Sequence, residues 1–193
     1  MSQFEFFMAF YGLLLGLGVA ELLGGFANLL RQKSPPRLGL VTPLIGAIVL
    51  TEMLANFIDA WVKFQDIAIT LPTLAIPTAI GLIYFVIAVI VVPRDLGEWT
   101  DLDDYMALRR RWIVGLLILA NCLIAALEVT RLDRTFTGGA TGLAWRWIGA
   151  NLWLIGSYAL IFFGRPRWLV IAAAGSVFLF YALFYGVIPV MKM

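Results

Sequence analysis

Residues 38–61, LGLVTPLIGAIVLTEMLANFIDAW, decide the class of fold. The stretch is long enough to cross a bilayer, whose hydrocarbon core needs about 20 apolar helical residues. Its polar side chains Glu52, Asn56 and Asp59 are spaced four and three residues apart, so a helix places them on one face. The stretch therefore predicts a membrane helix that carries a polar stripe from its middle to one end.

Five further stretches resemble it in length and apolar character. They cover residues 4–30, 69–92, 112–129, 143–163 and 168–190. Of the 193 residues 62% are hydrophobic and 13% charged, whereas a soluble domain has about 45–50% and about 25%. Strand-like alternation is absent, and only helices or closed barrels satisfy their backbone polar groups in lipid. We therefore predict an all-α, polytopic integral membrane protein with six transmembrane helices.

The six stretches divide into two halves of three. We expect a single transmembrane domain over 1–193, with halves 1–92 and 112–193 joined by a polar connector at 93–111. Ile45-Gly46-Ala47 recurs as Ile148-Gly149-Ala150, which suggests a duplication. Three spans per half would invert one repeat relative to the other, as in many transporters. Chance matching in an apolar alphabet is the alternative.

The connector carries apolar residues at three- to four-residue spacing, with acidic residues early and basic residues late. The apolar positions are Leu96, Trp99, Leu102 and Met106, and the acidic ones are Asp101, Asp103 and Asp104. This order predicts a short amphipathic helix that lies on the cytoplasmic membrane surface. The three aspartates are expected on its solvated face rather than around a metal ion.

Lysine and arginine predict the orientation, because cytoplasmic loops carry an excess of them. Nine flank one side and five the other. The side with nine comprises the loops after the first, third and fifth spans, so we expect it to be cytoplasmic. Both termini would then lie outside a plasma membrane, and the bacterial inner membrane is the expected location.

Four acidic residues lie within or at the ends of the spans, namely Glu21, Glu52, Asp59 and Glu128. At 1.5 Å per residue, Glu21 is about 6 Å and Glu52 about 3 Å from the middle of its span. No lysine or arginine lies in the middle of a span. We therefore expect Glu21 and Glu52 to be protonated, or to face water or a bound cation. A neutral structural hydrogen bond is the alternative.

Two amides in the second half, Asn121 and Asn151, lie in the middle of their spans and could face the stripe of Glu52, Asn56 and Asp59. Such amides either line a pathway or hold helices together by hydrogen bonds. Tryptophan and tyrosine are expected mostly at the two membrane–water interfaces.

Small residues form a ladder on one face of the first span, at Gly12, Gly16, Ala20 and Gly24. Faces of this kind let helices approach closely. We expect the ladder to pack within the monomer or to form a contact between subunits of a homo-oligomer.

The absence of histidine and the single cysteine, Cys122, exclude most nucleophilic and metal-based catalysis. We expect no enzyme, no cofactor and no metal, and the net charge of +2 gives no basic stripe for nucleic acid. The leading hypothesis is a channel or small transporter for a monovalent cation or proton, with membrane lipid around it. The alternatives are a non-catalytic scaffold or accessory subunit, and an intramembrane enzyme acting on lipid.

Overall fold

The computed structural model describes the chain over residues 2–65, 70–137 and 141–187, without the side chains of 72, 128–137, 141–144, 146–147 and 186–187. Over these ranges the chain is all-helical and contains no strand. Parts of the predicted spans lie outside the described residues, namely residue 69 and residues 188–190. The side chain of Glu128 is also not described.

Six α-helices and two short helical segments make up the described chain. Their bounds are α1 Gln3–Arg31, α2 Val41–Lys63, α3 Leu71–Val91, η1 Leu96–Glu98, α4 Leu102–Thr137, α5 Thr141–Phe163, α6 Arg167–Tyr181 and η2 Ala182–Val187. Five helices in the described ranges are long and apolar enough to cross a membrane, and Ile148–Phe163 of α5 is a shorter apolar helix. The predicted all-helical architecture is confirmed, and it is that of an integral membrane protein.

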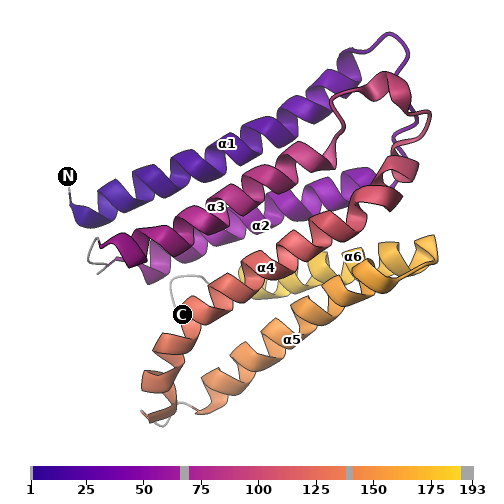
Figure 1. Cartoon of the computed structure of the whole chain (residues 1–193). Helices are drawn as coiled ribbons and strands as arrows, with labels where there is room; N and C mark the ends of the chain where they lie inside the picture. Colours follow the sequence, from indigo (N-terminus) through magenta and orange to yellow (C-terminus); the bar gives the residue numbers. More distant parts are fainter. Residues whose placement is uncertain (1, 66–69, 138–140, 188–193) are drawn as a thin grey trace.

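The helices form two groups that follow each other in sequence. In Figure 1, α1, α2 and α3 lie together, and α4 runs alongside them before the chain returns through α5 and α6. The most extensive packing joins α1 to α3, and contacts of α3 with α4 and of α2 with α6 join the two groups. Buried residues such as Ile48, Tyr84 and Tyr158 form one continuous core across both groups.

Close packing of α1 depends on Gly18 and Gly25. A Cβ atom on Gly18 would lie 2.9 Å from Met53 Cε, and one on Gly25 would lie 3.0 Å from Val92 Cβ. Small residues at these positions let the backbones approach. Neither glycine belongs to the ladder of small residues expected from the sequence.

The predicted ladder behaves differently. Gly12 packs against α2, with Phe57 Cε2 3.2 Å from its would-be Cβ, but Gly16 and Gly24 have no such atom within 4 Å and Ala20 is exposed. Packing within the monomer is therefore wrong for three of the four positions. These three small residues lie on the outer surface of α1.

The connector does not form one amphipathic helix on a membrane surface. It contains the short η1 turn, and from Leu102 onward it is already the first part of α4. Leu96, Leu102 and Met106 are fully buried in the core. The predicted apolar face is present, but its residues pack against other helices of the protein and not against lipid.

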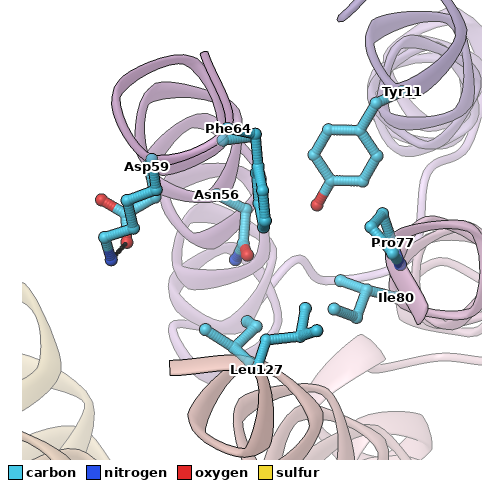
Figure 2. A pocket seen from close by; sticks show the side chains of 10 residues that line it. Tyr11, Asn56, Asp59, Phe64, Pro77, Ile80 and Leu127 are labelled. Carbon is cyan, nitrogen blue, oxygen red and sulfur yellow. Dashed lines mark hydrogen bonds and ion pairs between the residues drawn. The ribbon is translucent and has the colours of Figure 1, made fainter. Parts of the chain in front are cut away.

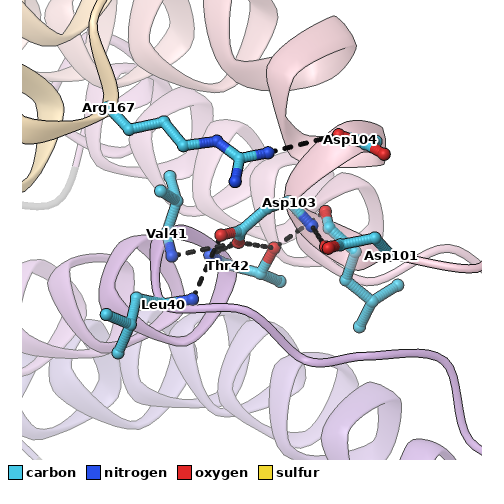
Figure 3. Close-up of polar contacts among 8 residues, drawn as sticks. Leu40, Val41, Thr42, Asp101, Asp103, Asp104 and Arg167 are labelled. Atoms are coloured by element: carbon cyan, nitrogen blue, oxygen red, sulfur yellow. Dashed lines mark hydrogen bonds and ion pairs between the residues drawn. The ribbon is translucent and has the colours of Figure 1, made fainter.

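Asp103 is a helix cap rather than a solvated side chain. It is 8% exposed, and its carboxylate accepts hydrogen bonds from the backbone N–H groups of Leu40, Val41 and Thr42 at 3.0–3.1 Å (Figure 3). These groups start α2, whose own N-cap residue Leu40 offers no side-chain acceptor. The expectation of a solvated face is wrong for Asp103, because its carboxylate accepts hydrogen bonds from the first N–H groups of α2.

The segment before α2 is fitted closely around this cap. The Arg37 N–H donates to Thr100 O at 3.0 Å, and the Leu102 N–H donates to Arg37 O at 2.9 Å. Gly39 has φ +65°, and a Cβ there would lie 2.2 Å from Asp103 Cγ. Both the left-handed backbone and the space require glycine at this position.

Candidate functional site

The carboxylate of Glu52 lies at the centre of the molecule and is fully buried. Its Oε2 accepts from the Tyr84 hydroxyl at 2.7 Å and from Asn121 Nδ2 at 3.2 Å. Its Oε1 accepts from the Tyr181 hydroxyl at 2.6 Å and from the Tyr158 hydroxyl. We call these five residues, Glu52, Tyr84, Asn121, Tyr158 and Tyr181, the carboxylate cluster.

Each donor of the cluster comes from a different helix. Glu52 lies on α2, and its four partners lie on α3, α4, α5 and α6 respectively. The side chain of Glu52 therefore joins α2 to α3 in its own group and to α4, α5 and α6 in the second group. The cluster lies where the two groups of helices meet.

The number of donors matches the chemistry of an ionised carboxylate. Two carboxylate oxygens offer about four lone-pair sites, and four protein donors point at them. A tyrosine hydroxyl can also turn and accept, so the same residues can hold a protonated carboxyl group. No lysine or arginine contributes to these hydrogen bonds. The cluster therefore surrounds a buried carboxyl group with hydroxyl and amide groups and, among the described residues, without a buried counter-cation.

A metal cation fits this arrangement poorly. A hard cation needs oxygen lone pairs that point at it, whereas the three hydroxyls and the amide that face Glu52 direct their hydrogens at the carboxylate in the observed arrangement. Among the described residues, no group of three or more histidine, cysteine, aspartate or glutamate side chains is placed to hold a metal ion.

Asn56 extends the polar network by one helical turn along α2. Its Nδ2 donates to the Tyr84 hydroxyl at 2.7 Å and to the backbone carbonyl of Glu52 at 3.0 Å. Asp59 follows on the same face, accepts from Lys63 Nζ at 2.7 Å and from the Tyr185 hydroxyl at 3.0 Å, and is half-buried. The predicted stripe of Glu52, Asn56 and Asp59 is therefore present on one face of α2, and each of the three side chains has its own hydrogen-bond partners.

A small cavity lies beside Asn56, toward the Lys63 end of α2. It measures about 30 Å³, and its lining includes Tyr11, Asn56, Asp59 and Pro77 (Figure 2). A cavity of this size holds water where polar groups line it. The Tyr11 hydroxyl points into the space beside Asn56. Within the described part of the chain, hydrogen bonds from Asn56 to the Tyr84 hydroxyl and from that hydroxyl to Glu52 link this cavity to the carboxylate.

Glu21 lies apart from the cluster. Its side chain is 35% exposed, and Arg94 Nη2 lies 3.4 Å from its Oε1. Glu21 has a cationic partner that its position in the apolar stretch did not predict, because Arg94 follows the end of α3 and reaches back to α1, and the pair is exposed. Depth along one helix does not predict such a contact from a neighbouring loop.

The two predicted amides have different positions. Asn121 belongs to the cluster, and its Nδ2 also donates to Leu117 O at 3.0 Å. Asn151 is half-buried on α5, two turns before Tyr158 on the same helix face. Of the six predicted pathway residues, the structure joins Glu52, Asn56 and Asn121 directly, and Asp59 lines the adjoining cavity.

The sequence analysis missed the three tyrosines, because it assigned tyrosine mainly to the membrane interfaces. Tyr84, Tyr158 and Tyr181 lie well inside their apolar stretches. The depth argument that identified Glu52 would also have marked these hydroxyls, since a phenol in the hydrocarbon core needs a partner. Their convergence on one carboxylate could not be read from spacing.

Comparison with known proteins finds no matching family model, no matching curated protein and no matching solved structure.

Proposed function

We propose that the protein is a small transporter or channel that moves protons across a membrane, with Glu52 as the group that binds and releases the proton. The single observation that carries this proposal is the buried carboxylate of Glu52, whose donors among the described residues are hydroxyl and amide groups. A carboxyl group inside a membrane protein is costly and usually functional. Monovalent metal cations are the less favoured cargo, because the surrounding groups are hydrogen-bond donors.

The cavity beside Asn56 supports access to Glu52 from the Lys63 end of α2. In the opposite direction, the residues Ile45, Ile48 and Val49 of α2 are buried and apolar. A cavity lined in part by polar side chains on one side and a buried apolar segment on the other favour a transporter over an open pore. In this proposal Asp59 and Asn56 line the approach, Asn121 orients the carboxylate, and Glu21 and Asn151 have no role in the path.

We further propose that all six helices span the membrane and that α1–α3 and α4–α6 are inverted repeats. The loops rich in lysine and arginine would face the cytoplasm, which places both termini outside and the Asn56 cavity on the outer side. Inverted repeats usually hold their site between the halves, and the cluster joins the two halves. The site itself is not duplicated, because Ile155 stands at the repeat position of Glu52.

Proton flux into proteoliposomes, followed with a pH-sensitive dye trapped inside, tests the proposal. We expect the wild type to dissipate an imposed pH gradient and Glu52→Gln to lose most of this flux, because an amide cannot exchange the proton. Glu21→Gln is the matched control and should keep the flux. Equal flux for wild type and Glu52→Gln would exclude Glu52 as the proton carrier.

A scaffold or accessory subunit is the second candidate, and one observation favours it. All four lone-pair sites of Glu52 are occupied by direct protein donors, as expected of a purely structural centre. The exposed surface of Gly16, Ala20 and Gly24 on α1 would then receive a partner helix or a second copy of this chain. A wild type without proton flux, whose stability nevertheless depends on Glu52, would support this candidate.

A further inference from the structure

A second pocket lies at the other end of the bundle, where α3 ends and α4 begins. It is open, measures about 420 Å³, and is lined in part by Arg94, Asp95, Glu98, Trp99 and Arg109. This volume is in the range of small-molecule sites. The pocket shares no residue with the carboxylate cluster or with the cavity beside Asn56.

The floor of the pocket is built firmly. The Tyr105 hydroxyl donates to Ile90 O at 2.6 Å, so its ring is tied to the end of α3. Trp99 packs edge-on against Tyr105, with ring centroids 5.1 Å apart. Tyr105, Arg109 and Trp112 all line the pocket and follow at four and three residues along α4, so they share one helix face.

The charges of the pocket occur in opposite pairs. Arg94 and Arg109 offer planar guanidinium groups that suit phosphate oxygens. Asp95 and Glu98 offer carboxylates that accept hydrogen bonds from an ammonium group. Arg94 is 77% exposed and its contact with Glu21 at 3.4 Å is long, so most of its donors are available to a ligand.

The depth of the pocket matches the headgroup layer of a membrane. It lies directly after the apolar helix Thr73–Val91, and Trp112 on its rim is 68% exposed. Exposed tryptophan at the end of an apolar stretch is typical of the membrane–water interface. A ligand in this pocket therefore meets lipid headgroups before it meets bulk water.

We propose that this pocket binds a phosphoethanolamine group, with the phosphate on Arg94 and Arg109 and the primary ammonium near Asp95 and Glu98. The group most readily available at this depth is the headgroup of a phosphatidylethanolamine lipid.

Lipid binding by the purified full-length chain tests this proposal, with native mass spectrometry as the readout. The probes are phosphatidylethanolamine, phosphatidylglycerol, which lacks the amine, and soluble glycerophosphoethanolamine. We expect phosphatidylethanolamine to bind more tightly than phosphatidylglycerol. Arg109→Gln should weaken its binding about tenfold, since a charge-assisted hydrogen bond is lost. Binding of the soluble compound as well would show that the site recognises the free group, with the same chemistry.

Arg111→Gln is the matched control, because Arg111 is exposed on the same helix, does not line the pocket and stands 5.9 Å from the Phe162 ring. It should leave binding unchanged. The double variant Asp95→Asn/Glu98→Gln should abolish the preference for phosphatidylethanolamine over phosphatidylglycerol. Equal losses in Arg109→Gln and Arg111→Gln, or equal binding of the two lipids by the wild type, would overturn the proposal.

Discussion

A single carboxyl group illustrates how this chain tolerates a polar side chain in its core. An isolated ionised carboxylate in an apolar interior is costly, and the four donors around Glu52 offset that cost. Hydrogen bonds to a charged group are worth about 1.5–3 kcal/mol each. Three of these bonds come from tyrosines, whose large side chains have few rotatable bonds and also fill the core.

Replacement of one hydrogen-bond donor to Glu52 should therefore lower the stability of the protein. We expect Tyr158→Phe to lower the free energy of unfolding by about 1.5–3 kcal/mol, because a hydrogen bond to Glu52 is lost. Tyr11→Phe is the matched control, since the Tyr11 hydroxyl points into the cavity rather than at the cluster. It should change stability less than Tyr158→Phe does, because no hydrogen bond to Glu52 is lost. Unfolding by denaturing detergent in mixed micelles measures both, and similar losses would argue against a special role for the cluster.

At the scale of elements, the start of α2 depends on a side chain 63 residues away in sequence from Leu40. The first N–H groups of a helix need acceptors, and Asp103 of α4 supplies them to Leu40, Val41 and Thr42. The same contact fixes the connector against the segment before α2. It also explains why the connector folds onto protein instead of onto a membrane surface.

Asp103→Ala should destabilise the protein by about 1–2 kcal/mol, in the range of lost helix caps. Faster hydrogen exchange is expected at the amides of residues 40–42, which lose their acceptor. Asp104→Ala provides the comparison, because Asp104 is exposed and its ion pair with Arg167 is 3.4 Å long (Figure 3). Such a surface pair contributes about 0–1 kcal/mol. If exchange at residues 40–42 stays slow in Asp103→Ala, Asp103 is not the cap.

At the scale of the whole molecule, the two groups of helices are held together at their centre by the cluster. The proposed topology follows from charge, with the loops after α1 and α5 on one side and the loop after α2 on the other. In a Cys122→Ser background, Ser34→Cys and Arg165→Cys should be protected from a membrane-impermeant maleimide added to whole cells. Gln65→Cys should be labelled. The opposite pattern would invert the topology, and labelling of Ser34→Cys and Gln65→Cys together would contradict the proposed span of α2.

Hydropathy predicted the helices well, because an apolar stretch of about 20 residues is typical of a membrane-spanning helix. α1 and α2 begin and end within three residues of the predicted stretches. α4 begins ten residues earlier than expected, since its polar first turns pack on the protein. Glu52, Asn56 and Asn121 were predictable from their depth. Contacts between distant segments, such as Arg94 with Glu21 or Asp103 with α2, depend on tertiary packing that one sequence does not reveal.

The central claim is that Glu52 takes up and releases a proton. Infrared difference spectroscopy of the protein in lipid, recorded while the pH of the medium is cycled, tests it most directly. We predict that the C=O stretch of a protonated carboxyl group appears on acidification, disappears reversibly, and is absent from Glu52→Gln. A band that never appears in the wild type, or one that persists at every pH, would show that Glu52 keeps one protonation state and serves only to hold the helices together.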